Sequence, residues 1–200
     1  MASILKVDTI QDQSGNNIIN ENADTITIGA SGDTITVPTG ATIDLSNATQ
    51  TGVGGTNTPA FRAYISTAPT FSVNTATKVV CDTEDFDTNN NFASGTFTPT
   101  VAGKYFVYGQ VSITNNTSGD AMKYGIAIIK KNTSELIRNN VDPNAGANAN
   151  QAYCFLGTVV SMNGSSDYLE LFVQSDAASG TPQVGDNSNQ TFFGAYKIIE

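Results

Sequence analysis

The chain has 200 residues, of which 14% are charged, and its net charge is −9. Nine basic groups stand against eighteen acidic ones, which argues against nucleic acid or an anionic membrane surface as a partner. Both of these partners are bound mainly through lysine and arginine. No apolar run approaches the roughly 20 residues that a membrane-spanning helix needs. Abundant Gly, Asn, Thr and Ser disfavour long helices and favour a turn-rich all-β protein.

Residues 1–23 alternate short apolar groups with polar turns, and a hairpin is expected around Gly15. The segment has too little apolar material to stand alone. We interpret it as a docking peptide that orders on a partner, and a frayed terminus is the competing interpretation. It lacks the apolar core of a signal peptide, so assembly in a cytoplasm is expected. The docking side chains would be Ile4, Leu5, Val7 and Ile10.

A short motif occurs in residues 24–29, again in 33–38 and more loosely in 41–46. Each copy predicts a strand of about four residues with two apolar side chains on one face. Two such side chains cannot form a core, so three chains would wrap about an axis and supply one another's interior. A single-chain solenoid is the alternative. We predict a trimeric β-repeat shaft over 24–50, whose core residues are Ile26, Ile28, Ile35, Val37, Ile43 and Leu45.

The composition changes at residues 51–59, which are rich in glycine and predict a hinge. The remaining residues, 60–200, contain short strand-like runs separated by turn signals and show no helical period. Such a pattern predicts a ten-stranded antiparallel sandwich or jelly roll with its own core. The predicted strands are 60–66, 70–73, 78–82, 95–97, 105–114, 122–130, 135–139, 151–162, 168–174 and 190–199.

The run from residue 105 to 113 is the strongest strand signal, and it follows a tight corner at Ser94-Gly95. Its residues alternate between an apolar face and a mixed face, which is typical of a strand in the middle of an antiparallel sheet. The apolar face would hold Tyr105, Val107, Val111 and Ile113; the mixed face would hold Phe106, Tyr108, Gln110 and Ser112.

One stretch of the chain contains Phe97, Gly103 and Tyr105, followed by an apolar continuation to Val111. This stretch resembles the central signature of the complement-type globular head, a tumour-necrosis-factor-like jelly roll. The upstream Phe86, Asp87 and Phe92 and the closing segment 191–198 are similar to flanking patterns of that family. The resemblance implies a ten-stranded jelly roll that packs as a tight homotrimer on an elongated stalk.

A trimeric head on a short repetitive shaft also resembles the fibres of tailed bacteriophages, and residues 1–12 and the repeats are similar to fibre proteins of marine phages. The resemblance implies a virion fibre or spike that docks through its N-terminus to a tail adaptor or capsid protein. Its head would attach the particle to the host surface, and to glycan in particular, by multivalent non-covalent binding. The alternative is a capsid-attached fibre or decoration protein with a purely structural role.

Acidic residues cluster at 82–87, where Glu84, Asp85 and Asp87 are candidate calcium ligands. A solvated loop without metal is the simpler interpretation, and glycosidase chemistry by paired carboxylates is a third. The chain has no histidine and no phosphate-binding glycine motif, so we expect neither an enzyme nor a cofactor other than calcium. Cys81 and Cys154 lie in apolar runs and are expected to be buried free thiols.

Two polar segments, 141–150 and 175–189, are too long for simple turns and predict either recognition loops or filler. Amide, hydroxyl and small side chains suit weak hydrogen bonding to sugars. The candidate binding residues are Asp142, Asn144, Asn148, Asn150, Gln183, Asp186 and Asn187. Five tyrosines within strands are interpreted as core or trimer-interface residues: Tyr64, Tyr124, Tyr153, Tyr168 and Tyr196.

Overall fold

The protein is represented by a computed structural model, which describes residues 9–11, 13–15, 17–22, 25–29, 31–44, 57–115, 122–142, 151–177 and 180–198. The chain divides into two units, Met1–Thr51 and Gly52–Glu200, here called the N-terminal unit and the head. The division falls at the start of the segment predicted as a hinge. The described residues form strands and turns, and none of them belongs to a helix that could cross a membrane.

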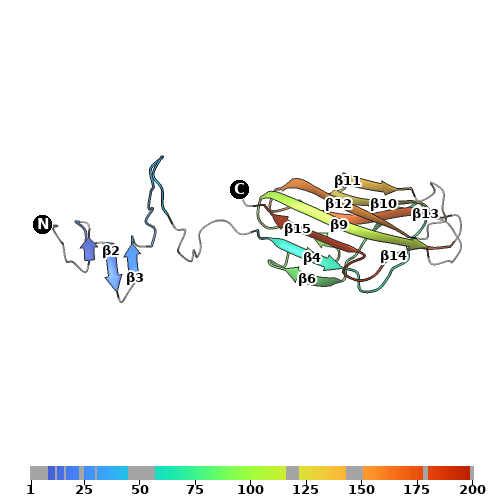
Figure 1. Cartoon of the computed structure of the whole chain (residues 1–200), viewed down its shortest axis with the longest axis horizontal. Helices are drawn as coiled ribbons and strands as arrows, with labels where there is room; N and C mark the ends of the chain where they lie inside the picture. The colour runs from blue at the N-terminus through green and yellow to red at the C-terminus, as the bar shows by residue number, and fades with distance from the viewer. Residues whose placement is uncertain are drawn as a thin grey trace. The chain divides into compact units, whose positions relative to one another are not determined.

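The N-terminal unit contains one antiparallel sheet of three strands in the order β1-β2-β3 (Figure 1). The strands are β1 (Thr9–Gln11), β2 (Asn17–Asn22) and β3 (Thr25–Ile28). The expected hairpin at Gly15 is confirmed, since β1 pairs with β2 and Gly15 has a φ of 83°, which glycine adopts without strain.

Among the described residues, the first of the three predicted repeat strands is present. Residues 31–44 contain no strand, so the prediction is wrong for 33–38 and for the described part, 41–44, of the third repeat at 41–46. The interruptions are local: Gly32 and Gly40 have positive φ, and the carbonyl of Pro38 accepts a turn hydrogen bond from the amide of Ala41 at 3.0 Å. Of the predicted docking and shaft residues, Ile4, Leu5, Val7 and Leu45 lie outside the described residues.

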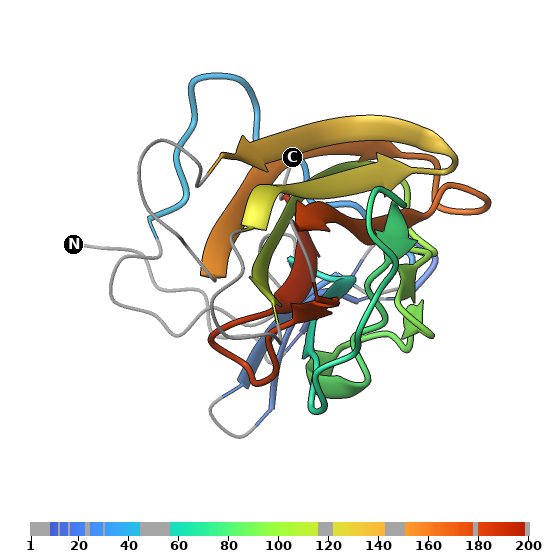
Figure 2. The same ribbon diagram turned by 90° about the vertical axis from the view of Figure 1, so that its right-hand side faces the viewer.

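The head is a sandwich of two antiparallel six-stranded sheets (Figures 1 and 2). One sheet has the order β12-β9-β15-β4-β6, with β14 paired to β9; the other has the order β11-β10-β13-β8-β7, with β5 paired to β13. From β9 to β15 the chain crosses repeatedly between the sheets: β9, β12, β14 and β15 lie in one, and β10, β11 and β13 lie in the other. The strands are β4 (Ala60–Tyr64), β5 (Thr77–Lys78), β6 (Thr83–Asp87), β7 (Phe92–Ala93), β8 (Thr96–Phe97), β9 (Gly103–Asn115), β10 (Met122–Lys131), β11 (Ser134–Val141), β12 (Gln151–Met162), β13 (Leu169–Ala177), β14 (Pro182–Val184) and β15 (Phe192–Lys197).

The structure confirms most of the predicted strands of the head and corrects four points. Of the predicted strand 78–82, only Lys78 belongs to a strand, because β5 ends there. Residues 70–73 form only an isolated bridge, between Thr70 and Gln183. The acidic segment is a strand, β6, and not a loop. The segment 175–189 is not one long loop, because β13 continues to Ala177 and β14 lies within it. Short edge strands with polar residues carry little periodic signal, which explains why β6, β7 and β14 were missed.

The strand β9 is placed as predicted, between β12 and β15 in the middle of its sheet. The side chains of Tyr105, Val107, Val111 and Ile113 are fully buried between the two sheets. The corner before this strand is a two-residue hairpin loop that joins β7 to β8, and both Ser94 and Gly95 have positive φ, as a type I′ turn requires.

The core of the head is organised around Phe61 on β4. Its ring stacks at 4.5 Å on both Phe92 and Phe97 and meets Phe193 edge to face at 5.1 Å. Phe97 in turn contacts Tyr105, whose hydroxyl donates to the carbonyl of Val101 at 2.7 Å. Phe92, Phe97, Tyr105 and Phe193, which lie in the segments that carried the family resemblance, therefore form one buried cluster with Phe61 between the sheets.

The turn between β12 and β13 depends on Gly164. The side-chain oxygen of Asn163 accepts hydrogen bonds at 3.0 Å from the amides of Ser165, Ser166 and Asp167. Gly164 has a φ of 72°, and a Cβ there would lie 2.4 Å from the backbone nitrogen of Ala102. Replacing Gly164 with alanine is therefore expected to lower the free energy of unfolding by about 1–3 kcal/mol. Urea unfolding measures this loss; Ser165→Ala, in the same turn, should leave stability nearly unchanged.

Both cysteines are free and buried, as expected. Burial raises the pKa of Cys81 to about 12 and that of Cys154 to about 11. Neither thiol should react with a disulfide reagent at pH 8 until the head unfolds, which a thiol titration with and without denaturant measures. Because these pKa values are raised from 9.0, the stability contributed by the neutral thiols is complete below pH 9 and is lost as the pH rises through 11 and 12.

Candidate functional site

The outward face of the sheet formed by β12, β9, β15 and β4 is unusually aromatic. The strand register places side chains of neighbouring strands in rows, because directly opposed residues point to the same face. One row runs Phe155, Gln110, Phe192, Tyr64, and another runs Val159, Phe106, Tyr196, Ala60. We call this surface the aromatic face; its members are Phe106, Tyr108, Tyr153, Phe155, Val159, Phe192 and Tyr196.

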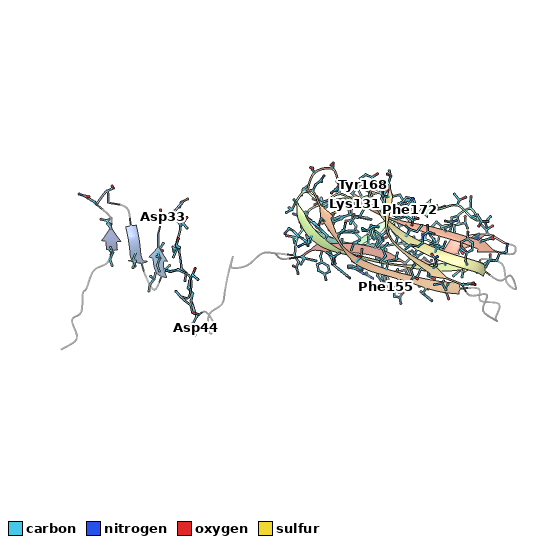
Figure 3. All side chains as sticks on the ribbon, turned by 90° about the horizontal axis from the view of Figure 1, so that it is seen from above. Asp33, Asp44, Lys131, Phe155, Tyr168 and Phe172 are labelled. Atoms are coloured by element: carbon cyan, nitrogen blue, oxygen red, sulfur yellow. The ribbon has the colours of Figure 1, made fainter. Side chains whose placement is uncertain are left out.

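The aromatic face is exposed in the single chain. Tyr153, Phe155, Val159 and Tyr196 are between 38% and 54% exposed. Figure 3 shows Phe155 on the outside of the head. Contiguous apolar patches of this kind are rare on monomeric proteins, and aromatic residues are enriched where protein chains meet. The arrangement therefore has the chemistry of a contact surface.

Two glycines give Tyr108 its place at the centre of this face. In the register, Tyr108 lies between Gly157 on β12 and Gly194 on β15. A Cβ on Gly194 would lie 2.5 Å from the Tyr108 ring, and a Cβ on Gly157 would lie 3.2 Å from the ring of Phe106. The rings consequently lie flat over backbone that carries no side chain. Burial raises the pKa of Tyr108 above its ordinary value. The charge of Arg62 lowers this pKa in part, and the neighbouring Tyr196 raises it further.

Arg62 marks the boundary of the aromatic face on β4. Its guanidinium lies 4.7 Å from the centre of the Phe192 ring, donates to the carbonyl of Ser188 at 2.5 Å and forms an ion pair with Asp85. On the same side of the sheet, the amide of Gln110 donates to the carbonyls of Asn189 and Gln190 at 3.0 and 3.1 Å. These bonds hold the segment before β15 against the edge of the face.

The three candidate calcium ligands are not brought together. Asp85 lies at a β-bulge, since Arg62 pairs with Phe86 and Ala63 pairs with Glu84, and its carboxylate is engaged by Arg62. Asp87 accepts hydrogen bonds from the amides of Phe92 and Asn89 at 2.8 and 3.3 Å. Among the described residues, no group of three or more Asp, Glu, His or Cys could hold a metal ion. The cluster forms the exposed edge of a sheet.

Some of the candidate binding residues are described by the structure and some are not. Asn144, Asn148 and Asn150 lie outside the described residues. Asp142 is exposed at the end of β11, and Asp186 is exposed after β14.

Two of the candidates have structural roles. Gln183 lies in β14 and donates to the carbonyl of Ala68 at 3.1 Å. Asn187 forms a turn: its φ is 80° and its amide donates to the carbonyl of Ile65 at 2.8 Å.

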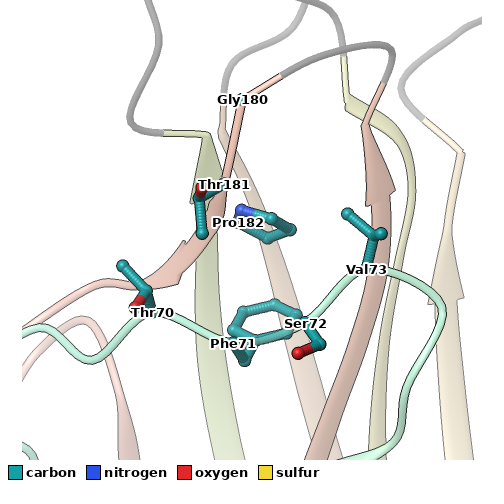
Figure 4. A pocket seen from close by; sticks show the side chains of 7 residues that line it. All are labelled: Thr70, Phe71, Ser72, Val73, Gly180, Thr181 and Pro182. Carbon is teal, nitrogen blue, oxygen red and sulfur yellow. The ribbon is translucent and has the colours of Figure 1, made fainter.

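A shallow cavity of about 370 Å³ lies where residues 70–73 run beside residues 180–182. It is at the end of the head opposite Ala60, near the point where β9 ends (Figure 1). The amide of Phe71 donates to the carbonyl of Pro182 at 3.0 Å, and Figure 4 shows their rings side by side. The lining also includes Val73 and the hydroxyl-bearing side chains of Thr70, Ser72 and Thr181. It therefore combines apolar rings with hydroxyl groups.

Comparison with known proteins shows the fold. No protein-family model matches the chain, and no curated protein is significantly similar to it in sequence. Among solved structures, Eiger TNF from S. frugiperda matches with a TM-score of 0.53 and 12% identity, over 70% of this chain and 92% of that one. Murine APRIL, in crystals at pH 5.0, matches with a TM-score of 0.51 and 13% identity, over 70% of this chain and 98% of that one.

The head is a tumour-necrosis-factor-like jelly roll. The resemblance drawn from Phe97, Gly103 and Tyr105 is confirmed at the level of the fold. The aromatic face was only partly foreseen: Tyr153 and Tyr196 were interpreted as core or interface residues, and both are exposed on it. Phe155, Phe192 and Val159 were missed, because only the register across three strands places them beside Phe106 and Tyr108.

Proposed function

We propose that the protein is a homotrimeric fibre of a bacteriophage virion, assembled in the host cytoplasm, whose head attaches the particle to the host surface without catalysis. The observation that carries this proposal is the contrast between the two units. The head has a complete core and an exposed aromatic face, whereas the N-terminal unit has one sheet and no second layer among its described residues. A unit that consists of one uncovered sheet becomes stable when it associates with other chains.

The trimer is supported by the aromatic face and by the apolar side chains of the N-terminal unit. The described shaft residues Ile26, Ile28, Ile35, Val37 and Ile43 are all at least 40% exposed in the single chain. Packing against copies would remove this surface from water, at about 25 cal/mol for each Å² of apolar area. Mass measurement in solution should therefore give close to three times 20.9 kDa, and a single-chain mass would contradict the trimer.

Attachment to a glycan is supported by the cavity at the end of the head opposite Ala60. Aromatic and proline rings with a few hydroxyl groups offer a sugar both an apolar surface and hydrogen-bond partners. Three such cavities on one trimer would raise avidity without a strong single site. The strand β11, which ends at Val141 just before Asp142, reaches the same end of the head, because Gly125 pairs with both Val141 and Ser175.

The test uses the full chain on a glycan array and on host cells. Val73→Asp, at the rim of the cavity, should abolish binding, whereas Val80→Asp, a comparably exposed valine outside it, should not. Absence of binding by the unsubstituted chain, together with unchanged adsorption of particles that lack it, would contradict attachment. It would leave the structural alternative, a fibre or decoration protein on the capsid. Cryo-microscopy of the particle separates the two by showing whether residues 1–23 contact tail or capsid proteins.

A further inference from the structure

A network of polar side chains lies on the sheet that contains β10 and β13, at the end of the head that holds the cavity. The hydroxyl of Tyr124 on β10 donates to the side-chain oxygen of Asn74. The amide of Gln174 on β13 donates to that hydroxyl and to the backbone carbonyl of Asn74, both at 3.3 Å. The carboxylate of Asp176 accepts hydrogen bonds from the side chains of Asn74 and Lys123, the latter at 3.0 Å. We call Asn74, Tyr124, Gln174 and Asp176 the polar shelf.

The polar shelf adjoins the cavity. Val73, whose side chain lines the cavity in Figure 4, and Asn74 are consecutive residues, with Cα atoms about 3.8 Å apart. Asn74 has a φ of 56°, which asparagine tolerates, and its amide donates to the carbonyl of Ser175 on β13 at 2.8 Å. Because Gln174 and Asp176 flank Ser175, this bond places Asn74 beside the other members of the shelf. Both point away from the core, since they alternate along β13 with buried residues.

The hydrogen-bonding groups of the polar shelf suit an uncharged ligand rich in hydroxyl groups. Its one carboxylate, Asp176, is paired with Lys123, so the two together carry no net charge. One amide hydrogen of Asn74, one lone pair of the Tyr124 hydroxyl and the side-chain oxygen of Gln174 have no partner among the described residues. A sugar hydroxyl both donates and accepts, and so matches this mixture. A phosphate or carboxylate would instead need an unpaired cation.

We propose that the polar shelf is a second sugar subsite, so that the head binds a neutral oligosaccharide with one unit in the cavity and the next unit on the shelf. The inference rests on the attachment to glycan in the proposed function and deepens it, because it names the class of glycan: uncharged and at least two units long. It does not depend on the number of chains in the assembly, since both subsites belong to the same chain.

The network holds its side chains in place before a ligand arrives. The hydroxyl of Tyr124 is hydrogen-bonded both to Asn74 and to Gln174, so binding requires little further loss of side-chain freedom. The hydrogen bond from Lys123 lowers the pKa of Asp176, and one from Asn74 acts in the same direction. This carboxylate is therefore ionised at neutral pH and accepts stronger hydrogen bonds from sugar hydroxyls than a neutral group does.

The test is isothermal titration of the full-length chain with free sugars, which measures one binding site at a time. The probes are glucose, galactose, their neutral oligosaccharides of two to four units, and the sialylated and uronic-acid forms of these. Asp176→Ala and the conservative Tyr124→Phe should weaken binding of neutral sugars of two or more units at least about tenfold. Binding of single sugars, which occupy the cavity alone, should not change.

The matched control is Glu170→Ala. Glu170 lies on the same strand and the same face as Asp176, is 17% exposed against 18%, and is likewise paired with a lysine, Lys78 at 2.7 Å. It is six residues away, which is about 20 Å along a strand. Its replacement should leave the affinity for every probe unchanged, and thermal unfolding of each variant shows that the head remains folded.

The outcomes separate this inference from the proposed function. A loss of affinity confined to Asp176→Ala and Tyr124→Phe, and to neutral sugars of two or more units, supports the inference. Unchanged affinity of these two variants, an equal loss in Glu170→Ala, or tighter binding of the sialylated or uronic-acid probes overturns it and leaves attachment to glycan standing. If the unsubstituted chain binds none of the probes, attachment to glycan is contradicted, and the inference with it.

Discussion

Replacing Phe155 with glutamate is expected to convert the proposed trimer into folded single chains. The side chain is 54% exposed on the aromatic face, so the carboxylate can remain in water in an isolated head. In the trimer the same change would bury an unpaired charge in every subunit, and each buried charge without a partner costs about 3–5 kcal/mol. A threefold arrangement repeats this cost three times. Sedimentation or light scattering should show the mass falling to 20.9 kDa.

The matched control for this experiment is Val80→Glu. Val80 is 48% exposed, which is close to Phe155, but it lies in the connection between β5 and β6 and not on the aromatic face. The Val80 variant should retain the mass of the unsubstituted protein, and both variants should retain the circular dichroism of a β-protein. A Phe155→Glu chain that stayed trimeric would show that the aromatic face is not the contact between heads.

Replacing Phe61 with alanine is expected to reduce the free energy of unfolding of the head by about 3–5 kcal/mol. Phe61 is fully buried and contacts Phe92, Phe97 and Phe193, so its removal leaves a cavity that three rings on different strands border. These rings come from both sheets, and the remaining contacts cannot close the space without separating paired strands. Urea unfolding followed by tyrosine fluorescence measures the loss.

Phe86→Ala serves as the comparison for Phe61→Ala. Phe86 is the same residue type on the neighbouring edge strand β6, but 46% of its surface is exposed, and the change should cost under about 1 kcal/mol. Equal losses for the two variants would mean that the aromatic cluster around Phe61 does not determine the stability of the head.

Local sequence patterns were sufficient to predict those elements in which buried and exposed residues alternate regularly. The alternation from Tyr105 to Ile113 predicted a central strand, and β9 is one. The corner at Ser94-Gly95 was predictable for the same reason, since its conformation depends on two adjacent residues. Such features need no information from distant parts of the chain.

Features that depend on pairing between distant strands could not be predicted. The neighbours of Phe106 on the aromatic face are Val159 and Tyr196, which lie far away in the sequence and meet it only through the register of β12 and β15. The repeats illustrate the opposite error. Similar residues at 24–29 and 33–38 predicted similar strands, but Thr25–Ile28 becomes a strand because β2 pairs with it, and residues 33–38 have no such pairing.

The edge strand β6 would have a consequence if, as proposed, many copies of the protein stand on one particle. An unpaired strand edge is a template onto which a neighbouring molecule can add its own strand, and crowded display would favour that growth. Here the edge carries Glu84, Asp85 and Asp87 and is bent by a bulge at Asp85. Approaching edges of two molecules would repel each other, so heads arrayed densely on a particle of the proposed kind would remain separate instead of fusing into a continuous sheet.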